Sequence, residues 1–377
     1  MSIEIRRVTT KKELREFIRF NYELYKDNPY SVPDLLEDML STFSKTKNPA
    51  FEFCEADYFL AYKDGKLAGR VAAIINHRAN NTWNTRNVRF GWIDFIDDQQ
   101  VSAALISAVK LWGKQRGMTD IVGPLGFTDI DAEGMLIEGY DQLSTMATIY
   151  NYPYYPRHME ALGFEKQTDW IEMRLTVPER LPDEYARVAE LVKRRYNLHI
   201  RKLKSRQEIF HSDIVRKIFD IINEAYAPLF GYSKMSNRQI ELYVKEYFPL
   251  LDLRMITIVE DANNEPVAVG VSMPSLSRAL QKAHGKLFPT GWYHLARALF
   301  VKHSPTLDLL LVGVKKEYQN KGVNALLFAD LIPIYIKMGF KYGETNPELE
   351  TNEKVQAQWK YLSGRIHTRR RCYHKSL

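Results

Sequence analysis

Residues 308–325 form the segment whose residue types and order point most directly to chemistry. Apolar residues up to Val314 are typical of a strand, a polar turn follows, and a helical pattern begins near Gly322. The first amide groups of a helix have no partner within it, and they lie where the helix dipole is positive. The segment therefore predicts a binding site for an anion such as a phosphate.

The turn in this segment has the sequence Gln319-Asn320-Lys321-Gly322-Val323-Asn324. It resembles the acyl-CoA-binding signature of the GNAT superfamily of N-acetyltransferases, Gln/Arg-x-x-Gly-x-Gly/Ala. Asn324 departs from that signature, because it puts a larger side chain at the second small-residue position.

The resemblance implies that the protein uses acetyl-CoA, or another acyl-CoA, as co-substrate. The pantetheine arm would then run along the strand before the turn, at Leu311, Val312 and Val314. The pyrophosphate would bind to the turn, which comprises Tyr318, Gln319, Asn320, Lys321, Gly322, Val323, Asn324 and Ala325.

The order of predicted elements occurs twice along the chain. Residues 5–14 and 200–209 resemble each other, and each pairs a strand with a helix start. Thr10 and Ser205 are expected to cap these helices, each with a glutamate three residues later, which is the spacing of a capping box. A strand hairpin, a strand, a helix and a further strand follow in both halves, so the chain is expected to contain two copies of one domain.

Together, the repeat and the GNAT resemblance imply an α+β fold of two tandem domains. Each domain would be a mostly antiparallel twisted sheet with a splayed pair of parallel strands, flanked by helices. We expect a degenerate GNAT-like domain at 1–177, a linker helix at 178–197, and a domain with the acyl-CoA turn at 198–377.

The first half lacks the features of the anion-binding turn. Its corresponding strand, residues 90–95, is followed by Ile96-Asp97-Asp98-Gln99, which has no glycine and two adjacent acids. Carboxylates repel a pyrophosphate, so we expect that this copy does not bind CoA.

An aromatic run at residues 150–156 of the first half has two interpretations. It either lines a pocket for the acceptor or packs between the domains. In the first interpretation Tyr152, Tyr154 and Tyr155 bind the substrate, together with Asn346 of the second half.

Acyl transfer from a thioester needs a deprotonated amine, a base and donors for the oxyanion. Of the carboxylates near the expected splay, Glu344, Glu348 and Glu350, we select Glu344 as the base; surface carboxylates without a catalytic task are the competing explanation. Members of the family often place a tyrosine, as general acid, at the position that Trp359 occupies here. Tryptophan cannot supply a proton, so Tyr361 or Tyr373 would have to do so.

Two other segments also have two interpretations each. Residues 276–303 have no counterpart in the first half, and their apolar residues recur at helical spacing from Trp292 to Phe300. They form either a lid or interfacial helix, or a helix that packs on the other domain. The C-terminal run with Arg369-Arg370-Arg371 either binds an anion, such as the CoA 3′-phosphate, tRNA or lipid headgroups, or belongs to a last strand with one solvated face.

Composition excludes several classes of protein. The chain has 377 residues, 45% of them hydrophobic, which suits about two folded domains and excludes disorder as the main state. Two cysteines exclude a disulfide framework and indicate a reducing compartment, so a cytoplasmic location is expected. No apolar run suits a signal peptide or a membrane span, no histidine spacing suggests a metal site, and the net charge of +7 favours anionic partners in general.

The leading hypothesis is an acyl-CoA-dependent N-acyltransferase whose acceptor is the amine of a small molecule or a peptide. One alternative is a Fem-type transferase, which would use aminoacyl-tRNA and has no need of the turn at 319–324. The other is a non-catalytic acyl-CoA-binding protein, motivated by Trp359 and Asn324. Oligomeric state is left open.

Overall fold

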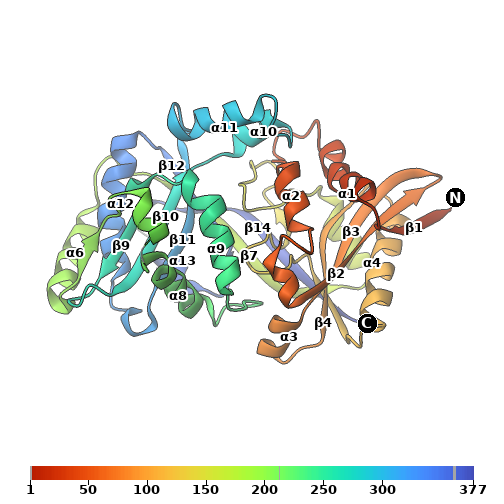
Figure 1. The fold of residues 1–377 in the computed structure, drawn as a ribbon, viewed down its shortest axis with the longest axis horizontal. Coiled ribbons are helices and arrows are strands. Elements are labelled where there is room, and N and C mark those ends of the chain that lie inside the picture. The colour runs from red at the N-terminus through yellow and green to blue at the C-terminus, as the bar shows by residue number, and fades with distance from the viewer. Residues whose placement is uncertain (1, 212, 360–361) are drawn as a thin grey trace. The chain divides into compact units, whose positions relative to one another are not determined.

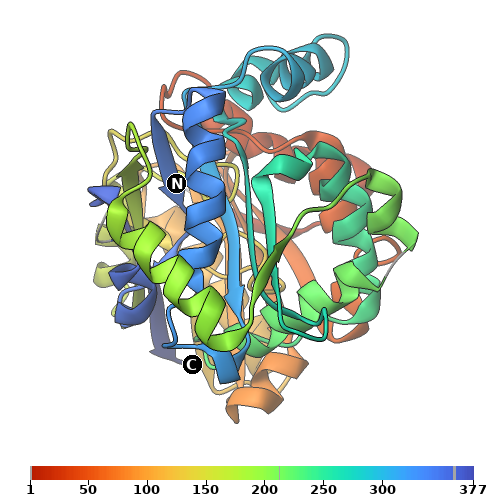
Figure 2. The same cartoon turned by 90° about the vertical axis from the view of Figure 1, so that its left-hand side faces the viewer.

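The computed structural model describes residues 2–211, 213–359 and 362–377 (Figures 1 and 2). Its contacts divide the chain into two compact units. Unit 1 comprises Met1–Ile171, Leu276–Ala296 and His367–Leu377, and unit 2 comprises Glu172–Ser275 and Arg297–Ile366. Each unit thus takes segments from both halves of the sequence. The predicted ranges 1–177, 178–197 and 198–377 describe copies of a sequence pattern and stay a prediction.

Unit 1 is built on a mixed sheet with helices. Strands β1 to β4 are antiparallel neighbours, β5 is parallel to β4, and β14 is antiparallel to β5. Its elements are β1 (Ile3–Arg7), α1 (Lys11–Leu24), α2 (Leu36–Thr42), β2 (Cys54–Lys63), β3 (Lys66–Asn76), α3 (His77–Trp83), β4 (Asn87–Phe95), α4 (Gln99–Lys114), β5 (Asp120–Gly123), β6 (Met135–Glu138), α5 (Tyr154–Ala161), β7 (Glu165–Thr176), α10 (Ser277–Ala283), α11 (Gly291–Phe300) and β14 (Arg365–Ser376), of which β7, α11 and β14 extend into unit 2.

Unit 2 repeats this arrangement. Strands β8 to β11 are antiparallel neighbours, β12 is parallel to β11, and the end of β7 is antiparallel to β12. Its further elements are α6 (Asp183–Tyr196), β8 (His199–Arg201), α7 (Arg206–His211), α8 (Ile214–Tyr226), α9 (Asn237–Tyr247), β9 (Ile256–Glu260), β10 (Pro266–Pro274), β11 (Thr306–Val314), α12 (Asn324–Met338), β12 (Tyr342–Thr345), β13 (Glu348–Leu349) and α13 (Glu353–Ala357). The predicted α+β class, with a mostly antiparallel sheet and one parallel pair in each half, is confirmed.

Local sequence explains where the corresponding elements of both units begin. Thr10 caps α1 and forms a capping box with Glu13. Ser205 accepts a hydrogen bond from the amide of Glu208 at the start of α7, at the same spacing. These side chains bind amide groups that a helix start leaves without partners, which is why both copies keep them.

Each sheet is completed by a strand from the other half of the sequence. In unit 1, Tyr373 of the C-terminal strand β14 pairs with Gly123 of β5. In unit 2, Arg174 of β7 pairs with Glu344 of β12. The C-terminal strand is therefore part of the core of unit 1, and β7 positions one edge of the parallel pair in unit 2.

The basic C-terminal run belongs to this exchanged strand. Arg371 donates two hydrogen bonds to Asp169, and Arg370 is only 1% exposed and donates to the carbonyl of Ile149. Both arginines thus have structural partners within unit 1. No helix in the described part of the chain is long and apolar enough to span a membrane.

Candidate functional site

The turn between β11 and α12 presents a run of free amide groups. In the part of the chain that the structure describes, the amides of residues 320–324 donate no hydrogen bond. The amides of Tyr318 and Gln319 bond to the carbonyl of Lys315, and that of Ala325 bonds to the carbonyl of Gly322. Five successive donors at the start of a helix have the chemistry to bind an anion. The amides of Tyr318, Gln319 and Ala325, which were also predicted to bind the pyrophosphate, are already bonded within the chain, and the pyrophosphate site stays a prediction.

Gly322 has a physical reason for being glycine. Its φ is +77°, where a side chain is strained. A Cβ atom there would also lie 3.2 Å from the side chains of Val188 and Val192 on α6. Helix α6 therefore packs against the turn and holds it in place.

Two polar side chains of the turn have defined neighbours. The Lys321 ammonium lies 5.1 Å from the ring of Tyr196 and 5.4 Å from that of Tyr318, which keeps a positive charge beside the free amides. Asn324, the departure from the family signature, donates to the side chain of Gln358 over 3.4 Å. The side-chain amide of Asn324 is thus hydrogen-bonded within unit 2.

The parallel strands β11 and β12 separate before β11 reaches the turn. Their pairing ends at Leu309 and Thr345. Beyond that point the side chain of Asn346 donates to the carbonyl of Leu310 over 2.8 Å. The gap opens beside the stretch that includes Leu311, Val312 and Val314, the residues predicted to contact pantetheine, and Tyr226 donates to the carbonyl of Val312.

A pair of buried carboxylates lies next to the point where β11 and β12 separate, one position before their last paired residues. Asp308 of β11 stands opposite Glu344 of β12, and Glu344 stands opposite Arg174 of β7, whose Nε is 3.6 Å from Glu344 Oε1. Side chains alternate along a strand, and the neighbours Leu307 and Gly343 face α12. Asp308 and Glu344 therefore point to the opposite face of the sheet, against which α8 packs.

Asp308 is in an unusual electrostatic environment. It is 1% exposed, and within the described residues neither carboxylate oxygen accepts a hydrogen bond of normal length. Burial raises the pKa of Asp308 to about 7; the nearby Ser275 hydroxyl opposes this rise and the charge of Glu344 adds to it. Carboxyl groups that hold and release a proton near neutrality are suited to acid–base catalysis.

A second perturbed carboxyl group lies beside Trp359. Glu348 Oε1 accepts a 2.8 Å hydrogen bond from the indole of Trp359, and Oε2 has no partner within the described residues. Burial raises the pKa of Glu348 to about 7, against the effect of that hydrogen bond. Burial also raises the pKa of Tyr226 to about 12, and the charge of Glu348 contributes. Trp359, at the position where members of the family often have a tyrosine, is thus hydrogen-bonded to a carboxyl group that can carry a proton.

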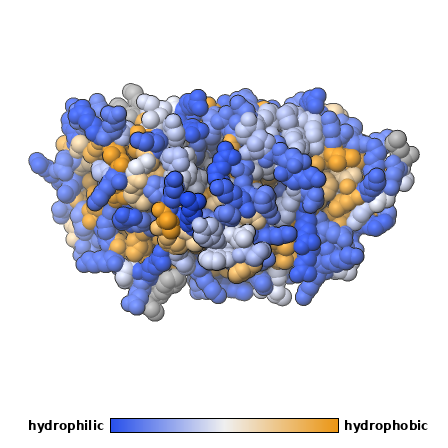
Figure 3. All heavy atoms as spheres, turned by 90° about the horizontal axis from the view of Figure 1, so that it is seen from above, coloured by the Kyte–Doolittle hydropathy of each residue, from blue (hydrophilic) through white to orange (hydrophobic). Residues whose placement is uncertain are grey.

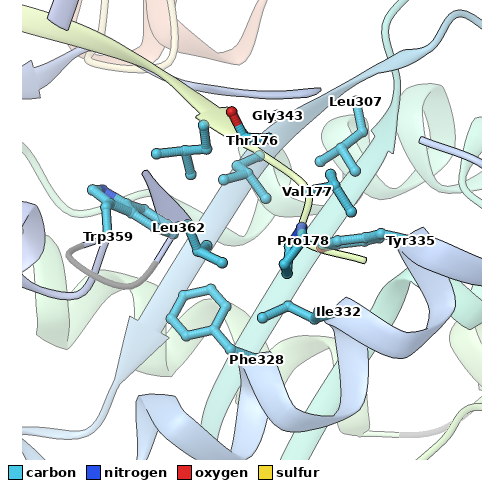
Figure 4. Close-up of a pocket in the computed structure, with 12 residues that line it drawn as sticks. Thr176, Val177, Pro178, Leu307, Phe328, Ile332, Tyr335, Gly343, Trp359 and Leu362 are labelled. Atoms are coloured by element: carbon cyan, nitrogen blue, oxygen red, sulfur yellow. The ribbon is translucent and has the colours of Figure 1, made fainter. Parts of the chain in front are cut away.

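The α12 side of the splay contains a small apolar cavity of about 20 Å³. Phe328 and Ile332 of α12 face Leu307 and Gly343 across it, and Trp359 closes one end (Figure 4). This volume has room for about one water molecule, so an acyl chain would enter only if these side chains moved.

The matching helix start in unit 1 is already occupied by a carboxylate. Asp98 caps α4 by accepting hydrogen bonds from the amides of Gln100 and Val101. Lys63 binds the same carboxylate and holds the pKa of Asp98 below its usual value. The geometry supports the expectation that this copy does not bind CoA, since its own side chain takes the amides that a phosphate would need.

Replacing Asp98 with Lys is therefore expected to leave CoA affinity within about twofold of the wild type, since coupling between distant sites is usually small. It should lower the free energy of unfolding by about 1 kcal/mol, because the cap of α4 is lost. Isothermal titration with CoA and chemical denaturation measure the two effects. A large fall in CoA affinity would instead place the cofactor in unit 1.

The predicted substrate tyrosines lie inside unit 1. The hydroxyls of Tyr152 and Tyr154 donate to the carbonyls of Leu24 and Phe95, and Tyr155, which is 1% exposed, bonds to Asp94. Their hydroxyls are thus committed to contacts within the unit, and their role in substrate binding stays a prediction.

The remaining predicted catalytic residues are distributed between the units. Glu344, like Asn346, is in unit 2, whereas Tyr373 is 1% exposed in β14 and belongs to the core of unit 1. Tyr361 lies outside the described residues. Sequence reasoning missed Asp308 and Tyr226, because no local pattern marks contacts between residues that are far apart in the chain.

No family model matches this chain. It is 28% identical to Protein YghO of Escherichia coli K12, over 99% of this chain and 95% of that protein. It is 25% identical to the bacterial ceramide synthase of Caulobacter vibrioides, over 98% of this chain and 96% of that protein. Among solved structures, a tandem GNAT protein from the clavulanic acid biosynthesis pathway superposes with a TM-score of 0.56 at 12% identity, over 100% of this chain and 98% of that one.

Proposed function

Because the chain has the tandem fold of the GNAT N-acetyltransferases, we propose that it transfers an acyl group directly from acyl-CoA to an amine. The observation that carries this proposal is the run of free amides at residues 320–324, which follows a strand whose splay from its neighbour begins next to buried carboxyl groups. The amides can bind a pyrophosphate, and the carboxyl groups can accept and donate protons.

In the proposed reaction, the nitrogen of the neutral acceptor amine bonds to the thioester carbon. The pair Asp308 and Glu344 accepts the proton that this nitrogen then loses, and the carbon–sulfur bond breaks. Glu348 gives its proton to the departing thiolate, so that CoA leaves as a thiol. The pKa values of about 7 for Asp308 and Glu348 suit these two tasks near neutral pH.

We propose a long-chain amino alcohol as the acceptor. A relative that matches 98% of the chain is named a bacterial ceramide synthase, and a ceramide is the N-acyl derivative of such an amine. The acyl group would then be a long chain, which requires the cavity between α12 and β11 to widen.

The test is an assay of the purified protein with acetyl-, octanoyl- and palmitoyl-CoA, each offered sphinganine, a small polar amine or a peptide amine. The released thiol and the mass of the amide product are measured. We expect amine-dependent thiol release with sphinganine and a long acyl-CoA. Thermal stabilisation by CoA without any product would indicate a binding protein, and transfer only to the polar amines would overturn the acceptor class.

A further inference from the structure

Helix α11 and the loop before it expose several large apolar side chains. The exposed fractions are 70% for Phe288, 50% for Trp292, 52% for Tyr293 and 63% for Phe300. Trp292, Tyr293 and Phe300 lie within about one quarter of the helix circumference, because residues seven and eight apart share a face. Exposed aromatic residues gathered in this way mark an interaction surface.

The same segment has an unusual charge. Residues 275–307 contain no aspartate or glutamate and five lysines or arginines, which are Arg278, Lys282, Lys286, Arg297 and Lys302. All five are exposed, and only Arg278 has a polar contact, with Gln281 and the Pro29 carbonyl, within the part of the chain that the structure describes. Exposed cations in the same segment as exposed aromatic side chains match the chemistry of an anionic lipid surface.

The segment is held firmly at its start. The side chain of Gln281 donates to the carbonyls of Pro29 and Ser31, and the amide of Leu36 donates to the carbonyl of Gly285. Helix α10 thus packs within unit 1. In α11, by contrast, Gly291 is the one buried residue among those that the structure describes.

Trp292 is suited to an apolar environment. Its indole N–H donates to the carbonyl of Pro289 over 2.9 Å. The ring can therefore enter the acyl-chain boundary of a bilayer without leaving an unpaired donor there.

We propose that residues 276–303, which we term the docking segment, bind the protein to the surface of an anionic phospholipid bilayer. Figure 3 views the molecule from the side of α10 and α11, with hydrophobic residues in orange among hydrophilic ones in blue. A second copy of the chain is a poorer occupant. A symmetric dimer would bring two sets of uncompensated cations together across one interface.

The test is flotation of the protein with vesicles of phosphatidylglycerol and phosphatidylcholine, compared with vesicles of phosphatidylcholine alone. We expect the wild type to float with the anionic vesicles, and less so in 0.5 M salt, since salt screens the attraction. The double variant Trp292→Ser/Phe300→Ser should bind at least tenfold more weakly, and Lys286→Glu/Arg297→Glu should lose the preference for the anionic lipid.

Leu111→Ser is the matched control, because Leu111 is 59% exposed on α4, away from the docking segment. It should float like the wild type, and circular dichroism checks that all variants are folded. The proposal is overturned if the wild type does not float, if Leu111→Ser loses as much binding as the docking-segment variants, or if those variants abolish a dimer instead. No acyl-CoA is present, so the result is independent of the proposed function.

Discussion

The Gly322→Asp variant should lose CoA binding by at least 100-fold. Its carboxylate would lie among the free amides of residues 320–324, where it would occupy or repel the site of the pyrophosphate. The measurement is thermal unfolding with and without CoA. A ligand at about 100 times its Kd stabilises the wild type by about 2.7 kcal/mol, and the variant should show no such shift.

Gly339 provides the control for backbone strain. It ends the same helix with a φ of +79°, and a Cβ there would meet no atom within 4 Å. Gly339→Asp therefore imposes a similar conformational cost of about 1 kcal/mol, but far along α12 from the turn. It should keep CoA binding. Equal CoA affinities of Gly322→Asp and the wild type would show that the pyrophosphate does not bind at this turn.

The Asp308→Asn variant should lower the rate of acyl transfer by 10² to 10⁴-fold, the usual contribution of a general base. Its volume is nearly unchanged, so CoA should still stabilise it. Glu353→Gln, on an exposed position in the first turn of α13, is the control and should keep the wild-type rate. A normal rate in Asp308→Asn, measured by thiol release, would exclude Asp308 from the reaction.

The same substitution should change how stability depends on pH. The pKa of Asp308 is about 7 in the folded protein and about 3.9 in an unfolded chain, so the folded state binds the extra proton between these values. The wild type should therefore lose stability as the pH rises from about 4 to 7, and each pH unit should lower its free energy of unfolding by up to about 1.4 kcal/mol. Asn carries no charge at any pH.

Asp308→Asn should accordingly be more stable than the wild type at pH 8, with the advantage shrinking towards pH 4. Denaturant unfolding at both pH values measures the difference. An advantage of the same size at pH 4 and pH 8 would show that the charge of Asp308 is not its source.

The sequence by itself determined the features that depend on neighbouring residues. The turn at 319–324 was recognised because a strand, a glycine and a helix start must be adjacent in sequence to present free amides. The two-copy organisation followed from the repeated order of elements, and Asp98, one of the adjacent acids at 97–98, lies at the start of α4 and caps it.

Only the tertiary structure decided the features that depend on pairing between distant residues. Asp308 is an ordinary acid in the sequence, and its pKa is raised because β11, β12 and α8 bury it beside Glu344. The exchange of β7 and β14 could not be foreseen, since strand patterns specify a face but not a partner. Likewise, nothing in the sequence shows that the indole of Trp359 is hydrogen-bonded to Glu348, 2.8 Å away. Hydrogen bonds and burial between remote segments are set by the packing of the whole unit, and no local pattern records them.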